Sequence, residues 1–231
     1  MKPVHWYHMW VGDHYHTAAW EIPAEEHFGA LINAEFDGEV YVGLVGGLPE
    51  RAAAMKWLRG WWPESEIVVQ SDEGFEQVTI GEMHKWCKWA REDVPVYYAH
   101  GKGSLRNLPG NRDWRMAMDK LLIGTVGKPA WKDCVNSLHT YDAVGCHWLT
   151  HEQYPEDINP RAPMFGGNFW WANSGYLAKL GEVQGTPERP PVTRWGAEGW
   201  VGTGFPSVLD LKPGWPDYPH EEDAARFAVP G

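Results

Sequence analysis

The segment from Tyr97 to Ser104 (YYAHGKGS) places an imidazole and an ammonium in a short loop interrupted by glycines. Gly101 and Gly103 allow the backbone to approach a ligand closely, and Lys102 supplies a point charge suited to phosphate. The GxxxxGK(S/T) spacing of a P-loop is absent. The pattern predicts a phosphate contact by Lys102, assisted by His100; a tight turn with a solvated lysine is the alternative.

A second candidate site is the stretch from Phe165 to Ser174 (FGGNFWWANS), which combines glycines, amides and aromatic rings. Asn168, Trp170 and Trp171 could form an aromatic platform with a polar handle, suited to a sugar ring or an acceptor. The alternative is a buried aromatic strand in which Asn168 satisfies backbone groups.

A third candidate is Glu198, which lies between aromatic residues in RWGAEGW. Partial burial disfavours the charged form of a carboxyl group, and a carboxylate tuned in this way suits a general base. Glu198 would then deprotonate an acceptor hydroxyl, with Asp142, near the start of a predicted strand, as the reserve candidate. The alternative is a helix-terminal glutamate paired with Arg194.

These segments belong to an ordered set of motifs, with Glu76 and Thr79-Ile80 upstream, that spans residues 76–200. The set resembles a family of bacterial and phage glycosyltransferases with a GT-A-type fold, and more distantly the rhamnan-synthesis transferases. The resemblance implies transfer of a sugar from a nucleotide-sugar donor, most simply a UDP-sugar, to a hydroxyl or similar acceptor. The motifs are His100-x-Lys102-Gly103, Trp114-Arg115-x-x-Met118, Gly167 to Ala172, and Arg194-x-x-Ala197-Glu198-x-Trp200.

The resemblance also distributes roles over the candidate residues. Glu198, Lys102 and His100 are the expected catalytic residues. The sugar or acceptor is expected at Arg115, Asp142, Asn168, Trp170 and Trp171. The donor diphosphate is expected at Gly12, Gly46, Glu76, His100, Gly101, Lys102 and Gly103.

The loop after the fourth predicted strand departs from the wider GT-A class, in which Asp-x-Asp binds a divalent metal. Here His100-Gly101-Lys102 stands in that place. A protonated lysine cannot ligate a metal, but it can neutralise the charge that develops on a leaving diphosphate. We therefore expect no metal site and no cofactor other than the nucleotide-sugar co-substrate. An N-terminal metal pair at His14 and His16 is the contrary possibility.

The elements that must position these residues alternate between strand and helix patterns. Short apolar strands followed by amphipathic helices predict an α/β fold, a single GT-A-like (Rossmann-like) domain with a mostly parallel sheet. Such sheets bind ligands at the carboxyl ends of their strands. Strands are predicted at 4–11, 39–45, 66–69, 94–99, 141–148 and 164–172, and helices from Pro23, at 49–58, from a Thr79/Glu82 capping box to about Arg91, at 114–122 and at 129–138.

We expect residues 1–205 to form the transferase domain and the proline-rich residues 206–231 to form a tail packed on it. The formal charge of −11 without a basic run disfavours duplex nucleic acid and anionic membranes. The 16 tryptophans favour carbohydrate handling, and the three cysteines lack CxxC spacing, which indicates buried free thiols. The absence of a membrane span or signal-peptide pattern predicts a cytoplasmic protein, in the host cytoplasm if phage-encoded.

Two other functions compete with sugar transfer. A carbohydrate-binding protein without catalysis would stack glycans on tryptophan, but such modules are expected to be all-β. A glycoside hydrolase needs two carboxylates about 5–10 Å apart, and Glu198 has no obvious partner. A glycan, a protein or a nucleic-acid base all remain open as the acceptor, and inverting and retaining outcomes both remain open.

Overall fold

The computed structural model describes residues 2–12, 20–101, 109–150, 162–183 and 195–214, without the side chains of Pro109 and Trp195. Several predicted site residues therefore lie outside the described residues: His14, His16, Lys102, Gly103 and Arg194.

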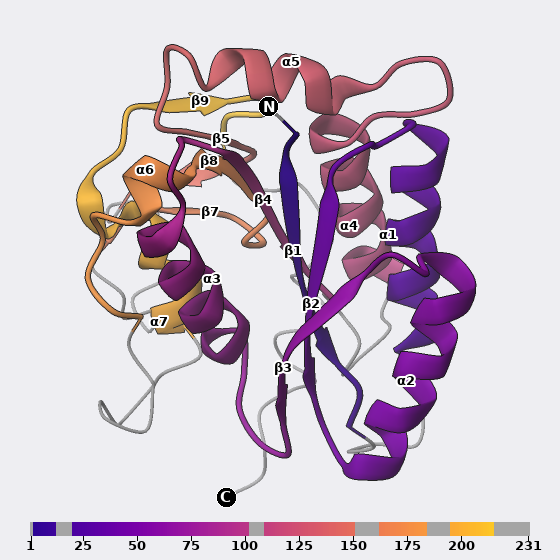
Figure 1. Cartoon of the computed structure of the whole chain (residues 1–231). Helices are drawn as coiled ribbons and strands as arrows, with labels where there is room; N and C mark the ends of the chain where they lie inside the picture. Colours follow the sequence, from indigo (N-terminus) through magenta and orange to yellow (C-terminus); the bar gives the residue numbers. More distant parts are fainter. Residues whose placement is uncertain (1, 13–19, 102–108, 151–161, 184–194, 215–231) are drawn as a thin grey trace, which may run out of the picture.

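The described residues form a seven-stranded sheet with the order β3-β2-β1-β4-β8-β5-β9 (Figure 1). Every neighbouring pair is parallel except those made by β8, which is antiparallel to both β4 and β5. The predicted mostly parallel α/β class is confirmed, which contradicts an all-β carbohydrate-binding module. The strands are β1 (Val4–Trp10), β2 (Glu39–Val45), β3 (Glu66–Ser71), β4 (Pro95–His100), β5 (Ala143–Gly145), β8 (Trp170–Asn173) and β9 (Val208–Asp210), while β6 (Trp148–Leu149) and β7 (Met164–Phe165) form a separate pair.

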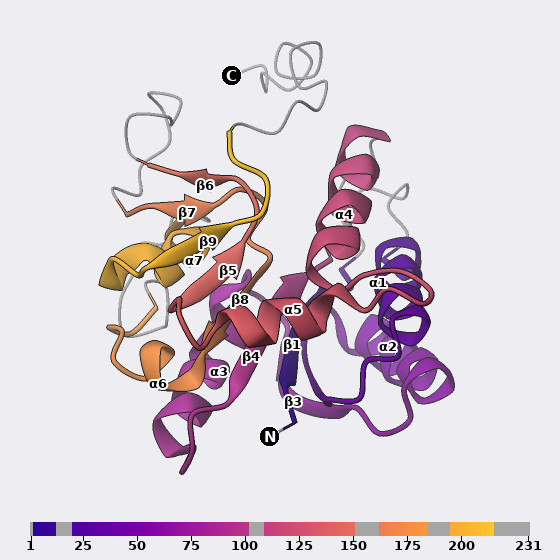
Figure 2. The same cartoon turned by 90° about the horizontal axis from the view of Figure 1, so that it is seen from above.

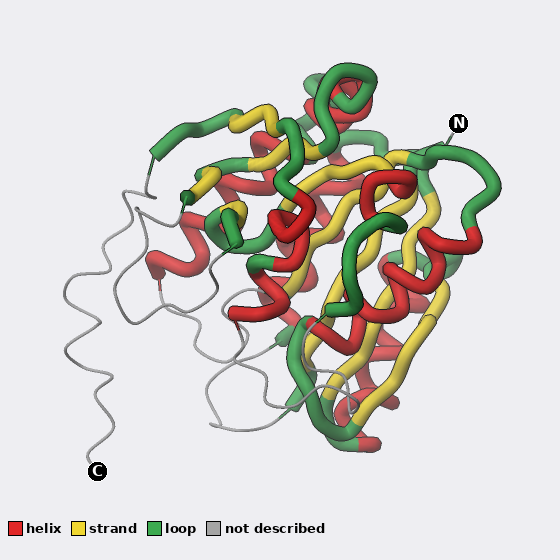
Figure 3. Tube along the Cα trace, turned by 90° about the vertical axis from the view of Figure 1, so that its left-hand side faces the viewer, coloured by secondary structure: helices red, strands yellow, loops and turns green. Residues whose placement is uncertain are grey.

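Helices cover both faces of this sheet (Figures 2 and 3). One face carries α1 (Glu21–Asn33), α2 (Leu48–Trp61) and α4 (Pro109–Leu122), and α5 (Ala130–Ser137) follows α4. The opposite face carries α3 (Gln77–Trp89) with the short helices α6 (Ser174–Leu177) and α7 (Trp195–Glu198), and the 3-10 helix η2 (Trp200–Gly204) follows α7. The sheet is thus the middle layer of three, as expected for parallel strands buried on both faces.

The hydrophobic core is divided in two by the sheet, because successive side chains of a strand point to opposite faces. In β1, Tyr7 and Met9 join the cluster beneath α1, α2 and α4. Val4 and Trp6 join the cluster beneath α3. Side chains that point to different faces are therefore separated by the sheet, however close they lie in sequence.

The structure corrects three expectations about individual elements. The helix α3 begins at Gln77, so Thr79 lies inside it and does not form the predicted capping box. The predicted strand at 164–172 divides into β7 and β8, because Gly167 and Asn168 have positive φ and turn the chain between them. The strand predicted within 141–148 is found as β5, and β6 begins at Trp148. Val208–Asp210, within the predicted tail, forms the edge strand β9 beside β5.

Candidate functional site

The carboxyl ends of β1 and β4 lie side by side at the point where the strand order reverses. From β1 the chain proceeds to β2 and β3 on one side, and then to β4 on the other. His8 of β1 pairs with His100 of β4, and the Gly101 amide donates to the His8 carbonyl over 2.9 Å. In open parallel sheets this switch point is where ligands bind, so the predicted location of the His100 loop is a candidate ligand site.

Glycines form the neighbouring rim, where β1 and β2 end. The Val11 amide donates to the Val45 carbonyl over 2.7 Å, which holds the two chain ends together. Gly46 has a φ of +146°, and a Cβ there would lie 2.8 Å from the Gly12 nitrogen. Glycine is therefore required at position 46, which is buried, while the Trp10 indole lies against Gly12.

A buried hydrogen-bond network underlies His100. Its Nε2 lies 2.9 Å from the Gly167 carbonyl oxygen, and its Nδ1 lies 3.3 Å from a carboxylate oxygen of Glu76. The other Glu76 oxygen accepts from the side-chain amide of Asn168, whose own oxygen accepts from the Trp170 indole over 2.8 Å. Glu76 is about 8% exposed and Asn168 is fully buried, so water contributes little to this network.

The direction of these bonds fixes the proton count of the network. Carbonyl and carboxylate oxygens are both acceptors, so the two ring nitrogens of His100 must both donate. That condition needs one proton beyond those of a neutral imidazole and an ionised Glu76, shared between the two residues. We infer that His100 is an imidazolium held by Glu76, which makes it a fixed positive charge beside the candidate ligand site.

The backbone around Gly167 is shaped to serve this network. Gly167 has a φ of +86°, and a Cβ there would lie 2.7 Å from the Met118 sulfur. Asn168 has a φ of +56° although it is not a glycine, and it is buried. Strained backbone of this kind persists where the surroundings over-determine it and gathers at functional positions. The strain here aims one carbonyl at His100 and one amide at Glu76.

Glu198 lies on the same side of the sheet as Glu76. Burial, followed by the charges of Glu76 and Glu198, raises the pKa of the Tyr98 phenol well above 10. Both carboxylates therefore face the region of one buried hydroxyl, and Glu198 itself is only about 4% exposed. Glu198 and Glu76 thus come from helix ends that are distant in sequence, the end of α7 and the start of α3.

The chain matches the model of a protein family, described as a domain of unknown function (DUF8361), over residues 6–185. The chain belongs to this family. No curated protein matches it.

Among solved structures, the DUF8361 chain is similar to 4-diphosphocytidyl-2C-methyl-D-erythritol synthase from Anaerococcus prevotii DSM 20548. The identity is 9%, the TM-score is 0.45, and the match covers 91% of this chain and 87% of that chain. A second crystal structure of a 4-diphosphocytidyl-2C-methyl-D-erythritol synthase matches at 12% identity and a TM-score of 0.44, covering 98% of this chain and 97% of that one.

Trp170 and Trp171 do not form one platform in the DUF8361 chain. They are neighbours in a strand and so point to opposite faces of the sheet. Trp170 stacks on Tyr98 with ring centroids 5.2 Å apart, and Trp171 stacks on Tyr97 at 4.9 Å. Both indoles are fully buried. Their role in this structure is packing, together with the indole bond that Trp170 makes to Asn168.

Arg115 lies across the sheet from the His100 network. It belongs to α4, is fully buried, and forms an ion pair with Glu26 of α1. Arg112 binds the same carboxylate with Nε at 2.6 Å, so the two arginines tie α4 to α1. These contacts give Arg115 a structural role, and its expected contact with the sugar or acceptor stays a prediction.

Asp142 lies at the amino ends of β4 and β5, whereas His100 lies at the carboxyl end of β4. It directly precedes β5, at the level where Pro95 of β4 pairs with Asn173 of β8. Its Oδ2 accepts from the amide and the hydroxyl of Ser207, at 2.9 and 2.7 Å. About five residues of β4 separate this level from His100, which is about 17 Å of strand. Asp142 and the His100 network thus belong to different sites.

A second histidine network, beneath α1 and α4, had no local signal in the sequence. His27 lies with Nδ1 2.9 Å from an Asp119 oxygen and Nε2 2.9 Å from Nε2 of His5. The other ring nitrogen of His5 lies 3.2 Å from the Tyr97 carbonyl. The side chains come from three elements up to 92 residues apart, and long-range pairs of this kind leave no spacing pattern.

Other chemistries find little support in the described residues. The described ranges contain no group of three or more His, Cys, Asp or Glu side chains that could hold a metal ion. Among the helices in these ranges, none has the length and apolar character to cross a bilayer. The three cysteines are buried free thiols, as predicted, and burial raises the pKa of each to about 12. A neutral thiol is a poor nucleophile, which argues against cysteine catalysis.

Proposed function

We propose that this DUF8361 domain transfers a sugar from a nucleotide-sugar donor, a UDP-sugar in the first instance, to a hydroxyl acceptor without a metal ion. The observation that carries the proposal is the switch point itself. The chain ends of β1 and β2, at Gly12 and Gly46, adjoin the buried His100–Glu76 pair at the end of β4, and we assign the positive charge of that pair to His100. A buried positive charge at the carboxyl ends of parallel strands suits a diphosphate.

In this proposal His100 acts through its charge and by anchoring the start of the loop. Both ring nitrogens already bind protein acceptors, so the imidazole has no hydrogen left for a phosphate oxygen. Lys102 follows Gly101 by one residue, and we assign it the direct contact with the diphosphate. Glu76 is then a positioning residue that holds His100, and it does not contact the donor.

Glu198 is the proposed base for an inverting transfer. A general base must reach the proton that it abstracts, although its geometry often tightens only when substrate is bound. Glu198 is buried near the Tyr98 phenol, so water contributes little around its carboxylate. In a retaining transfer Glu198 would orient the sugar instead.

The test is a donor panel of UDP-, GDP- and TDP-sugars with the full chain in excess EDTA, with nucleotide release and thermal shift as readouts. We expect release from one donor class and a loss of about 10²- to 10³-fold in Lys102→Ala, because one charge on the leaving group is removed. Lys56→Ala, an exposed lysine on α2, is the matched control and should behave as the parent.

Each outcome of the panel is informative. Release that requires added Mn²⁺ would keep the transferase and refute the metal-free mechanism. Equal loss in Lys102→Ala and Lys56→Ala would refute the assigned role of Lys102. The absence of both nucleotide release and thermal stabilisation with every donor in the panel would refute the proposed transfer.

A further inference from the structure

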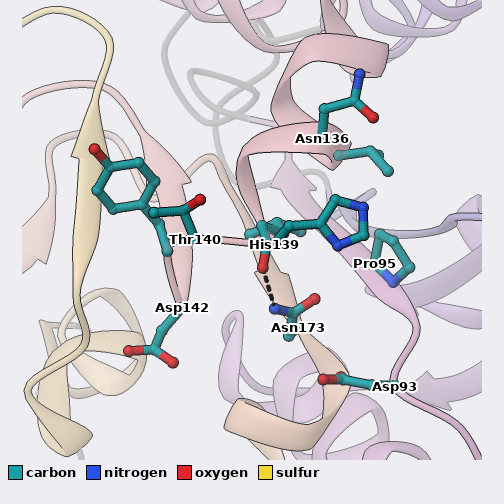
Figure 4. Close-up of a pocket in the computed structure, with 10 residues that line it drawn as sticks. Asp93, Pro95, Asn136, His139, Thr140, Asp142 and Asn173 are labelled. Atoms are coloured by element: carbon teal, nitrogen blue, oxygen red, sulfur yellow. Dashed lines mark hydrogen bonds between the residues drawn. The ribbon is translucent and has the colours of Figure 1, made fainter.

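A polar pocket of about 690 Å³ opens at the edge of the sheet opposite His100 (Figure 4). Its walls are the end of α5 with the turn that follows, the segment that leads into β4, and the end of β8. The volume is within the range of small-molecule sites. Its polar lining includes Asp93, Asn136, His139, Tyr141, Asp142 and Asn173.

Two carboxylates on either side of Asn173 are each fixed by one oxygen (Figure 4). Asp142 uses Oδ2 to accept from the Ser207 amide and hydroxyl. Asp93 uses Oδ1 to accept from the Gly175 amide over 2.8 Å. Among the described residues no hydrogen bond reaches the second oxygen of either group. Both carboxylates are therefore held in place with an acceptor oxygen to spare, which lowers the entropic cost of binding a ligand.

The rest of the lining mixes donors with acceptors. Asn173 donates its side-chain amide to the Leu138 carbonyl over 2.8 Å, which leaves its side-chain oxygen as an acceptor (Figure 4). Asn136 and His139 are exposed and lie above it in this view. Tyr141 is half-buried and adds a flat aromatic face with a hydroxyl. An amide, an imidazole and a phenol can each donate or accept.

This chemistry selects among ligand classes. Two carboxylates repel phosphates and other anions, and the polar lining disfavours an apolar ligand. An ammonium could donate to the carboxylates and to the amide, imidazole and phenol, so a polyamine is the competing ligand that the experiment below separates from a sugar. A sugar hydroxyl donates and accepts at once, and the C–H face of a pyranose stacks on an aromatic ring. We propose that this pocket is a second carbohydrate site, one that binds a pyranose unit of a glycan.

The proposed site is separate from the donor site. It lies at the amino ends of β4 and β5, about 17 Å of strand from His100. It would anchor a glycan chain whether or not the opposite edge transfers sugar, so its success or failure is independent of the donor panel. Asp142 then contributes to carbohydrate binding at a distance from the reaction.

The experiment is a ¹H–¹⁵N correlation titration of the full chain with methyl α-glucoside, methyl α-mannoside, methyl β-galactoside, rhamnose and N-acetylglucosamine. We expect at least one sugar to shift the amide signals of residues 136–142 and 173 with millimolar affinity. Asn136→Ala combined with His139→Ala removes two ligand contacts on exposed side chains, and we expect it to weaken binding at least tenfold. Adding Asp142→Asn to this double variant should weaken sugar binding further.

Asp133→Asn is the matched control, since it removes an exposed α5 carboxylate that does not line the pocket. Its affinity should equal that of the parent. The proposal is overturned if no sugar shifts these signals, if the double variant binds as tightly as the parent, or if spermidine saturates the site while the sugars do not. Nucleotide release from the donor is assayed in the same variants, so that a loss of sugar binding in this pocket can be distinguished from a loss of transferase activity.

Discussion

The two faces of the sheet each bury one histidine–carboxylate pair, and the two pairs differ in what surrounds them. His100 and Glu76 lie beneath α3, at the carboxyl edge of the sheet, each about 8% exposed. His27 and Asp119 lie beneath α1 and α4, where His27 is fully buried. The first pair adjoins the candidate ligand site, whereas the second is closed in by core side chains.

The second pair is likewise held by hydrogen bonds. His27 faces an Asp119 oxygen and the Nε2 of His5, while the Nδ1 of His5 faces the Tyr97 carbonyl. If His5 donates to that carbonyl, its Nε2 accepts from the Nε2 of His27. Both ring nitrogens of His27 and of His5 therefore have partners inside the core.

A buried histidine–carboxylate pair is therefore not by itself a functional site. What separates the pairs is their access to a ligand. His100 lies next to Gly101 and the glycine rim of the switch point, so its charge can act on a bound molecule. His27 is enclosed by the core, and its contacts with Asp119 and His5 tie α1 and α4 to the sheet.

The largest expected effect is on stability at the closed pair. His27→Ala should lower the free energy of unfolding by about 3–5 kcal/mol, because it leaves Asp119 buried without its partner. His100→Ala should cost about 1–3 kcal/mol, because water at the sheet edge can reach Glu76. Urea denaturation of both variants measures the difference. Equal losses would erase the distinction between a closed pair and an edge pair.

The second prediction concerns activity, for which we expect a change in the His100–Glu76 pair to have a larger effect than a change in the His27–Asp119 pair. A glutamine at position 76 offers one acceptor oxygen where Asn168 and His100 need two, so Glu76→Gln should misplace the loop. We expect nucleotide release to fall by about 10²-fold, mainly in kcat. Asp119→Asn makes the same chemical change in the other pair and should leave release within about twofold, assayed where both variants are folded. Equal losses in release would contradict the assignment of the two roles.

The third prediction concerns acid stability and the neutral neighbours of the two pairs. Burial, followed by the charge of His100, lowers the pKa of His8 to about 3. Burial, followed by the charge of His27, lowers the pKa of His5 well below 6.5. A folded pKa below the unfolded value stabilises the fold above about pH 6.5, and this contribution is lost as the pH falls.

His8→Asn should therefore flatten the fall in unfolding free energy between pH 6 and pH 4, by up to about 1.4 kcal/mol per pH unit. Asparagine retains a polar group near Thr79, which lies 2.8 Å from Nδ1 of His8. Urea midpoints measured across this range test the effect. An unchanged slope would show that His8 is not held neutral in the folded state.

The sequence predicts the local elements well but not the assignment of side chains to sites. β2 is found at its predicted bounds, because an apolar run ends at two glycines. The positions of Arg115 and Asp142 depend on which face α4 covers and on where β5 begins, and residue types do not report either. Trp170 and Trp171 show how alternation within a strand divides residues that look like one cluster. Glu76, which the sequence analysis assigned to the donor diphosphate, contacts His100, and no spacing pattern predicts that pairing.

The smallest expected effect is on the unfolding free energy and concerns Asn168, which supports the His100–Glu76 pair only. Asn168→Gly keeps the positive φ that the turn requires but removes the amide that joins Glu76 to Trp170. Relief of backbone strain offsets part of the lost hydrogen bonds, so we expect a loss of only about 1 kcal/mol in unfolding free energy. Asn168→Ala lacks both the amide and the backbone freedom and should lose about 1 kcal/mol more. Equal losses would show that the turn is unstrained, and that Asn168 contributes to the His100 network through its side chain alone.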